Sequence, residues 1–144
     1  SDAISGHGGF DPMALHGARV LLVEDNSVNM MIGVALLEQW GAEVVQAENG
    51  ALAIDAVDRS VGEGRPFDVV LMDVQMPGMS GHEATRALRR RWSADQLPII
   101  ALTAAALVSE REQALAVGMN DFVTKPIEPT RLRQALLKAL TKDA

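Results

Sequence analysis

The chain has 144 residues and a mass of 15.4 kDa, which is the size of one ordinary domain. It contains no cysteine, and this excludes thiol catalysis, cysteine-ligated zinc sites and iron–sulfur clusters. Because 19 acidic residues outnumber 13 basic ones, the net charge is −6, and we expect neither direct nucleic-acid binding nor membrane contact through bulk charge.

The first segment, residues 1–17, differs in composition from the rest of the chain. It holds four glycines and one proline and shows no sustained hydrophobic periodicity. Such a segment is typical of a flexible linker or of a scar left by cloning. We therefore expect the folded domain to cover residues 18–142.

From residue 18 onward, short apolar runs alternate with segments of helical length. The predicted strands centre on residues 20–23, 44–45, 69–72, 99–102 and 122–123. The predicted helices cover residues 27–40, 50–60, 81–92, 105–117 and 128–141. Continuous apolar strands are typical of parallel sheets that are covered on both faces. Five such strands alternating with five helices predict a doubly wound α/β fold.

Polar side chains follow four of the five predicted strands. They are Glu24 and Asp25 after the first strand, Asp73 after the third, Thr103 after the fourth and Lys125 after the fifth. The carboxyl ends of parallel strands share one edge of the sheet, and ligands bind at that edge in open α/β folds. The sequence therefore predicts a crevice that holds three carboxylates, a hydroxyl and an ammonium group.

Three carboxylates in one crevice would repel one another, and the repulsion would raise their pKa values. A divalent cation and the Lys125 ammonium would both relieve it, and Mg²⁺ suits such a site because it commonly bridges carboxylates to a phosphate. This combination is typical of phosphoryl transfer, in which a carboxylate can itself be the nucleophile. Asp73 is the best candidate nucleophile because it stands alone at the end of the most hydrophobic strand.

Four short segments carry these residues, and their order along the chain makes them specific as a set. They are Val-Glu-Asp-Asn at 23–26, Leu-Met-Asp-Val-Gln-Met-Pro-Gly-Met-Ser-Gly at 71–81, Ala-Leu-Thr-Ala at 101–104 and Gly-Met-Asn-Asp-Phe-Val-Thr-Lys-Pro at 118–126. With them, the chain from about residue 19 to residue 140 resembles the receiver domain of two-component response regulators. The resemblance implies a flavodoxin-like receiver fold, with a five-stranded parallel sheet in the order 2-1-3-4-5 and five helices.

The resemblance also implies the chemistry of the acidic residues. Asp73 would accept a phosphoryl group from a phosphohistidine on a partner protein. Asp25, Asp73 and the backbone carbonyl of Gln75 would bind Mg²⁺ as the cofactor. Glu24 would hold a water molecule that is bound to the metal.

The remaining site residues would respond to the phosphoryl group. Lys125 would pair with Asp73 and then with the phosphoryl oxygens, with a cis peptide bond before Pro126. Thr103 would move to donate a hydrogen bond to the phosphoryl group, and Phe122 would turn inward behind it. The resemblance therefore implies a domain that switches conformation on phosphorylation.

Two other classes of function compete with this interpretation. A hydrolase of the haloacid-dehalogenase type needs a second Asp two residues after its nucleophile, but Gln75 stands there and cannot titrate. We therefore do not expect a turnover enzyme, although the parent protein is a candidate histidine kinase. A docking module that works on the same fold without phosphorylation stays open as the alternative.

The first predicted helix offers a candidate surface for a partner. It is apolar almost all round, and Met30 and Val34 fall where many receivers carry polar residues. We expect these two residues to dock a histidine kinase or a histidine phosphotransfer protein, since the first helix commonly does so in the receiver family. A weak homodimer is a further expectation.

The segment around Asp73, Met-Asp-Val-Gln-Met-Pro, resembles the same segment in receivers that are attached to hybrid sensor histidine kinases. The residues after Thr103 are Ala104 and Ala105, so neither offers an acid or amide that could orient an attacking water. We therefore expect slow unassisted hydrolysis of the phosphorylated domain.

No apolar run approaches the ~20 residues of a membrane span, and we expect a cytoplasmic location.

Overall fold

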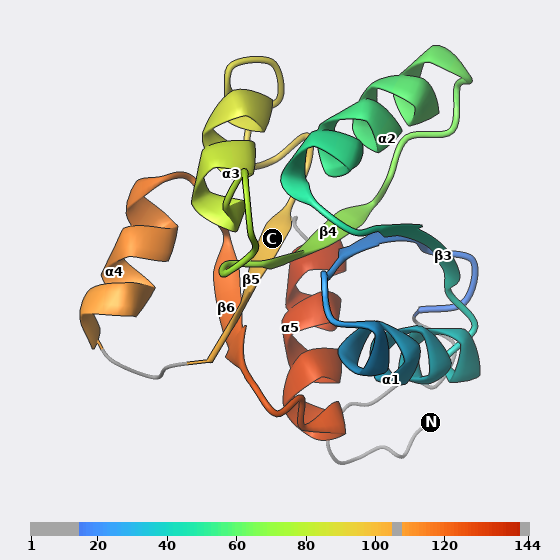
Figure 1. The fold of residues 1–144 in the computed structure, drawn as a ribbon. Coiled ribbons are helices and arrows are strands. Elements are labelled where there is room, and N and C mark those ends of the chain that lie inside the picture. The colour runs from blue at the N-terminus through green and yellow to red at the C-terminus, as the bar shows by residue number, and fades with distance from the viewer. Residues whose placement is uncertain (1–14, 105–107, 142–144) are drawn as a thin grey trace.

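The computed structural model describes residues 15–104 and 108–141 (Figure 1). The strands are β2 (Arg19–Val23), β3 (Glu43–Ala47), β4 (Val69–Asp73), β5 (Ile99–Thr103) and β6 (Asp121–Thr124). The helices are α1 (Ser27–Gln39), α2 (Gly50–Gly62), α3 (Gly81–Arg89), α4 (Val108–Ala116) and α5 (Pro129–Thr141). Strands and helices alternate along the chain, as the sequence predicts. None of the helices in the described ranges is long and apolar enough to cross a membrane.

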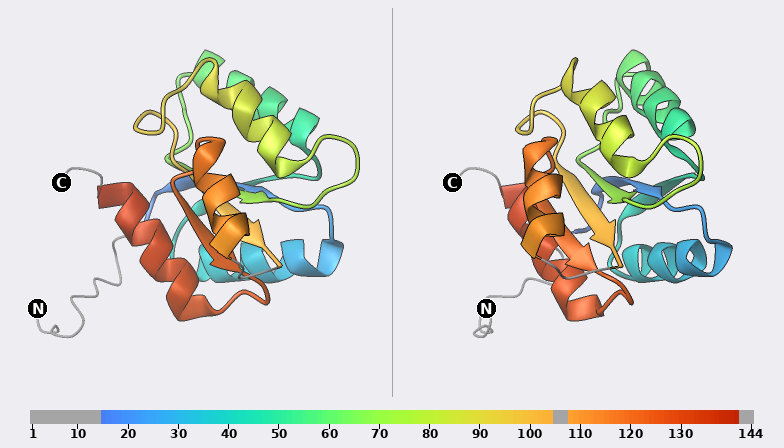
Figure 2. Two further views of the ribbon diagram at one scale, coloured as in Figure 1. Left: turned by 90° about the vertical axis from the view of Figure 1, so that its left-hand side faces the viewer. Right: turned by 60° about the vertical axis from the view of Figure 1, so that its left-hand side comes forward.

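The strands form one parallel sheet in the order β3-β2-β4-β5-β6. This is the predicted 2-1-3-4-5 arrangement, and the doubly wound fold class is confirmed. Helices α1 and α5 cover one face of the sheet, and α2, α3 and α4 cover the other (Figures 1 and 2). The register pairs Val23 with Met72 and Asp73 with Leu102, so β2, β4 and β5 end side by side at one edge.

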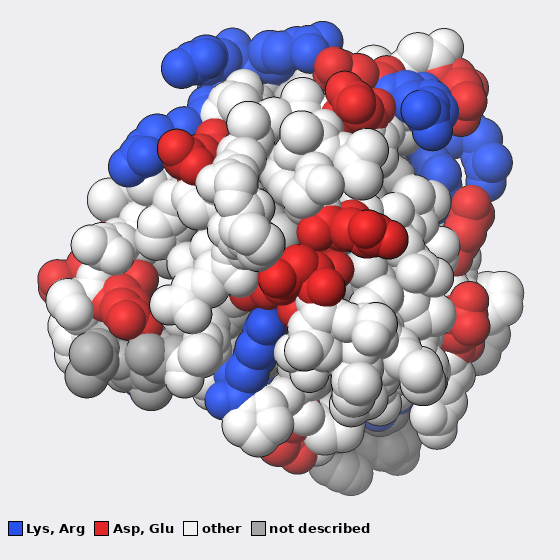
Figure 3. All heavy atoms as spheres, viewed as in Figure 1, with Lys and Arg blue, Asp and Glu red and all other residues white. Residues whose placement is uncertain are grey.

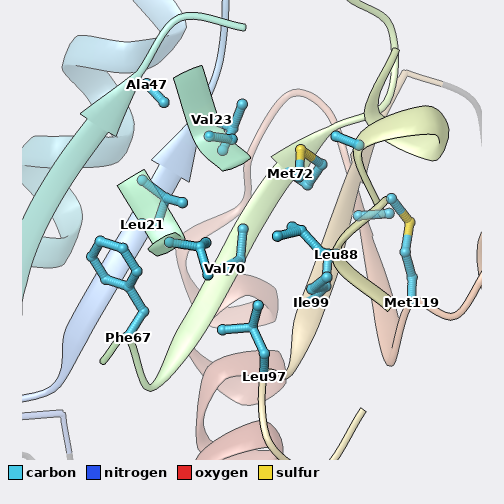
Figure 4. Close-up of a cluster of buried hydrophobic side chains, with 14 of the residues drawn as sticks. Leu21, Val23, Ala47, Phe67, Val70, Met72, Leu88, Leu97, Ile99 and Met119 are labelled. Carbon is cyan, nitrogen blue, oxygen red and sulfur yellow. The ribbon is translucent and has the colours of Figure 1, made fainter. Parts of the chain in front are cut away.

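Successive residues of each central strand belong to two different hydrophobic clusters. Leu21, Val70 and Ile99 lie in the cluster beneath α2, α3 and α4 (Figure 4). Their neighbours Val20 and Leu71 lie in the cluster beneath α1 and α5. Because successive side chains of a strand point to opposite faces, a sheet covered on both faces needs apolar residues at every position. This explains the continuous apolar runs in the sequence.

Helix α3 ends at Arg89, three residues before the predicted end at residue 92. The Arg89 side chain turns inward and donates hydrogen bonds to the carbonyls of Gly118, Ser93 and Leu97. The chain after the helix therefore folds back around this guanidinium. These bonds hold the Arg89 head group against the protein.

The prediction that residues 1–17 are a flexible segment is wrong for residues 15–17, which pack against the domain. Leu15 is only 2% exposed and belongs to the cluster beneath α1 and α5. The Gly17 N–H donates to the carbonyl of Gly41, which ties this stretch to the turn after α1. Burial of one apolar side chain therefore extends the packed domain to residue 15. Residues 1–14, and residues 105–107 of the predicted fourth helix, lie outside the described part of the chain.

Candidate functional site

The site begins with three carboxylates at the carboxyl edge of the sheet. One oxygen from each of Glu24, Asp25 and Asp73 lies within 4.8 Å of the others. Glu24 and Asp25 follow β2, whereas Asp73 ends the neighbouring strand β4. Glu24 and Asp73 are only 2% and 3% exposed, but Asp25 is exposed to solvent. Figure 3 shows acidic side chains gathered near the centre of this face, with basic side-chain atoms beside them.

The Lys125 ammonium lies between two of these carboxylates. Its Nζ atom is 2.9 Å from Glu24 Oε1 and 3.2 Å from Asp73 Oδ2. The Lys125 backbone N–H donates to the carbonyl of Thr103, which anchors the loop after β6 to the end of β5. The peptide bond between Lys125 and Pro126 is cis. The structure therefore brings Lys125 to the acidic crevice, although the two acids precede it in the chain by 101 and 52 residues.

The electrostatics of the crevice make Asp73 easier to protonate than an ordinary aspartate. Burial and the neighbouring Glu24 raise the pKa of Asp73 to about 7, although Lys125 opposes the shift. Burial alone would lower the pKa of Lys125, but hydrogen bonds and charge from Glu24 and Asp73 outweigh burial and leave that pKa raised. The crevice thus disfavours negative charge on Asp73, even with the Lys125 ammonium beside it.

The residues of the crevice fit a hard divalent cation. All three side chains offer oxygen, the ligand that Mg²⁺ prefers. Ligands on opposite sides of one Mg²⁺ lie ~4.2 Å apart, so oxygens within this cluster can share an ion with little movement. Glu24 and Asp73 each have one oxygen beside the Lys125 ammonium, whereas Asp25 is exposed to solvent. A bound cation would also offset the effects of burial and of Glu24 that raise the pKa of Asp73.

The backbone around Asp73 is held closely from both sides. The N–H of Gln75 donates to Asp73 Oδ1 at 3.2 Å, and the N–H of Gly81 donates to the carbonyl of Val74 at 3.1 Å. A Cβ atom built on Gly81 would lie 2.2 Å from the carbonyl oxygen of Asp73, so only glycine fits there. These contacts fix the end of β4 against the start of α3.

The remaining predicted site residues, Thr103 and Phe122, both contact α4. The Thr103 hydroxyl donates to Glu110 Oε1 at 3.4 Å. The guanidinium carbon of Arg111 lies 4.8 Å from the centre of the Phe122 ring. The sequence alone carries no signal for Glu110 or Arg111, because only the packing of α4 against β5 and β6 brings them to these side chains.

Comparison with known proteins then identifies the family. The family model described as the response regulator receiver domain matches residues 20–137. This chain belongs to the response regulator receiver domain family. The resemblance that the sequence motifs carry is thereby confirmed.

This receiver domain is similar to parts of sensor kinases and to solved receiver domains. It is 47% identical over 131 residues to the sensor protein GacS of Pseudomonas syringae pv. syringae. That match covers 88% of the chain but only 14% of GacS. The receiver domain of sensor histidine kinase PA1611 from Pseudomonas aeruginosa, solved with a magnesium ion in its active site cleft, is 38% identical with a TM-score of 0.72. This alignment covers 85% of our chain and 95% of that one.

A further solved structure shows a receiver domain with a partner. It is the complex of the Saccharomyces cerevisiae histidine phosphotransfer protein Ypd1 with the receiver domain of Ssk1. The sequence identity is 28% and the TM-score 0.73, over 90% of our chain and 96% of that chain.

The first helix of the receiver domain requires a correction to the predicted docking surface. Met30 is only 8% exposed and packs in the cluster beneath α1 and α5, while Val34 is half-buried. The large apolar side chains that α1 exposes are instead Val28, Met31 and Ile32, with Met31 68% exposed. Met30 therefore offers a partner little exposed surface, and this was not predictable because a helix that is apolar all round does not reveal which stripe faces the sheet.

A groove runs beside this helix from the acidic crevice. Its volume is about 690 Å³, and its lining includes Glu24, Asp25, Met30, Met31, Val34 and Glu38. The groove therefore joins two of the site's carboxylates to apolar and acidic side chains of α1. We call the exposed residues Val28, Met31 and Ile32 the α1 patch.

Proposed function

We propose that Asp73 is the phosphoacceptor of this receiver domain and that the donor is a phosphohistidine on a partner protein. The observation that carries the proposal is the contact between the Lys125 ammonium and Asp73 inside a cluster of three carboxylates. In the transfer, one carboxylate oxygen of Asp73 forms a bond to phosphorus as the P–N bond breaks. The imidazole leaves with the bonding electron pair.

Each neighbouring side chain has a role that follows from its position. Lys125 exchanges its contact with Asp73 for one with the phosphoryl oxygens, where negative charge builds during transfer. Asp25, Asp73 and the backbone carbonyl of Gln75 would hold Mg²⁺, and Glu24 would hold a metal-bound water. When bound there, Mg²⁺ supplies positive charge to the oxygens of the transferring group. The structure of the PA1611 receiver domain with magnesium in its cleft supports this assignment.

The phosphorylated domain differs in conformation from the unphosphorylated one. Thr103 donates its hydroxyl proton to a phosphoryl oxygen, and Phe122 turns inward behind it. The position of Thr103 at the end of β5, next to Asp73 on β4, supports this role. Hydrolysis of the phosphorylated domain is slow, because Ala104 presents no side chain that could orient a water.

The parent protein is a hybrid sensor histidine kinase in this proposal, as the likeness to GacS suggests. Its partner is a histidine kinase or a histidine phosphotransfer protein that docks on the α1 patch, and its location is cytoplasmic. The Ypd1–Ssk1 complex supports a phosphotransfer partner. The folded domain begins by residue 15 and ends near residue 142. Formation of a weak homodimer stays a prediction.

Intact mass spectrometry with a small-molecule phosphodonor tests the phosphoacceptor. We expect one added phosphoryl group that requires both Mg²⁺ and Asp73, so that Asp73→Asn gives none. Asp55→Asn, which changes an exposed carboxylate on α2, is the matched control and should be phosphorylated like the wild type. A wild-type domain that gains no phosphoryl group under any condition would favour the alternative, a docking module that acts through its surface.

A further inference from the structure

Two successive residues of α4 contact the two side chains that are proposed to move on phosphorylation. Glu110 accepts the hydrogen bond from the Thr103 hydroxyl at 3.4 Å. Arg111 places its guanidinium carbon 4.8 Å from the centre of the Phe122 ring. Thr103 ends β5 and Phe122 lies on the adjacent strand β6, so one turn of helix reaches both.

The contact between Glu110 and Thr103 is formed in a partly buried place. Glu110 is half-buried, and Thr103 is buried. Both line a small cavity of about 90 Å³ that also includes Gln75 and His82. Hydrogen bonds count for more where water is partly excluded, although a contact of 3.4 Å is long for a hydroxyl–carboxylate pair. A long bond of this kind is weak enough to be exchanged for another.

The contact between Arg111 and Phe122 holds the ring itself. A second guanidinium, that of Arg131, lies 5.6 Å from the ring centre. Arg131 also donates a hydrogen bond to the backbone carbonyl of Phe122 at 2.7 Å. The position of the Arg131 guanidinium therefore depends on the backbone of β6 and not on the orientation of the ring. Arg111 is exposed and stacks on the ring by a cation–π contact, which is worth ~0.5–1 kcal/mol at such sites. It therefore favours the present ring orientation over one turned away.

We infer that Glu110 and Arg111 are positioning residues that hold the Thr103 hydroxyl and the Phe122 ring in the arrangement of the unphosphorylated domain. This inference rests on the proposed function. A threonine hydroxyl has a single proton, so Thr103 donates either to Glu110 or to a phosphoryl oxygen on Asp73. Glu110 therefore competes with the phosphoryl group for Thr103, and α4 sets how readily the domain switches.

Binding of beryllofluoride, an analogue of the phosphoryl group, tests Glu110 without any donor protein. Calorimetric titration in the presence of Mg²⁺ compares the wild type with Glu110→Ala and with Glu112→Ala. Glu112 is an exposed acid on the same helix, so its variant loses the same charge. Loss of one weak hydrogen-bond competitor should tighten binding to Glu110→Ala about three- to tenfold. Glu110→Gln, which keeps an acceptor oxygen, should fall between that variant and the wild type.

A double-mutant cycle separates the contact with Thr103 from a general loss of negative charge. If Glu110 acts through Thr103, Glu110→Ala should not tighten binding further in a Thr103→Ala background. Tightening that persists in that background would overturn the inference, because charge and not the hydroxyl would then be its cause. Equal affinities of Glu110→Ala and Glu112→Ala would also overturn it.

The ring of Phe122 supplies an independent measurement for Arg111. In NMR spectra of the unliganded domain, Arg111→Ala should move the ring signals of Phe122 toward their positions in the beryllofluoride-saturated wild type. Ring signals that stay at the unliganded position would refute the role of Arg111. A wild-type domain that binds no beryllofluoride would overturn the proposed function together with this inference, whereas normal wild-type binding with unaltered variants overturns the inference alone.

Discussion

Gly81, the first residue of α3, packs against the backbone carbonyl of Asp73 so closely that a side chain has no room between them. A Cβ atom at Gly81 would lie 2.2 Å from that oxygen and 2.9 Å from the Cα atom of Val74. Both neighbours are backbone atoms, so neither can move aside by changing a rotamer. The start of α3 and the proposed phosphoacceptor are therefore coupled by shape alone.

Substitution of this glycine should damage both stability and the site. We expect Gly81→Ala to lower the free energy of unfolding by about 2 kcal/mol, as overpacking commonly does, and to slow phosphorylation by a small-molecule donor. Urea unfolding and intact mass spectrometry measure the two effects. Gly62→Ala at the end of α2 is the control, because nothing lies within 4 Å of its Cβ position. A Gly81→Ala domain as stable as this control would contradict the packing argument.

The raised pKa of Asp73 predicts how stability depends on pH in metal-free solution. The pKa of Asp73 is about 7 in the folded domain against an ordinary value of 3.8, so the folded state binds the proton more tightly than the unfolded state. The contribution of Asp73 to the free energy of unfolding is therefore largest below about pH 4 and falls as the pH rises to about 7.

Asp73→Asn removes this dependence, and comparison of the two proteins isolates it. With a chelator present, we expect Asp73→Asn to exceed the wild type in stability by an amount that grows with pH, reaching on the order of 2 kcal/mol at pH 8. Urea unfolding at pH 5 and pH 8 checks the sign. Added Mg²⁺ should reduce the difference, because a bound cation favours the ionised carboxylate. A difference that does not change with pH would refute the assignment.

Removal of the Lys125 ammonium should shift the titration of Asp73 further. Lys125 lies 3.2 Å from Asp73 Oδ2 and lowers its pKa against the effects of burial and Glu24. In Lys125→Met, therefore, the pKa of Asp73 should rise above its wild-type value. Carbon-13 NMR of the labelled carboxyl group measures this directly. Lys138→Met on α5, which removes an exposed lysine, should leave the titration unchanged.

The α1 patch predicts a difference between two kinds of phosphodonor. Met31→Asp places a charge on the exposed apolar surface of α1, and we expect it to slow phosphotransfer from a phosphorylated histidine phosphotransfer protein about tenfold or more. Phosphorylation by a small molecule should be unaffected, because that reaction needs no docking surface.

The matched control for this prediction is Leu52→Asp, which changes an exposed apolar residue on α2. It should react with both donors like the wild type. Equal slowing of both reactions in Met31→Asp would instead indicate damage to the acidic crevice. Met30→Asp is not a suitable test, because Met30 is buried and its substitution would destabilise the fold.

Much of the fold and the acidic crevice could be predicted from the sequence. Apolar residues at every position of 69–72 and 99–102 indicate a sheet that is covered on both faces, and the helical segments between the strands favour a parallel one. Once the strands are parallel, residues that follow them meet at one edge. The meeting of Glu24 with Asp73 was therefore predictable, although 49 positions separate them (73 minus 24).

Only the tertiary structure decided which face of each helix packs on the sheet and which side chains that are far apart in the sequence come into contact. Helix α1 is apolar all round, so its sequence does not show which of its faces packs on the sheet. Only the packing in the folded domain buries Met30 and exposes Met31. The contact of Glu110 with Thr103 likewise depends on the docking of α4. Local sequence determines periodicity and strand ends, because these follow from neighbouring residues. Helix rotation and long-range contacts follow instead from the shape of the packed surfaces.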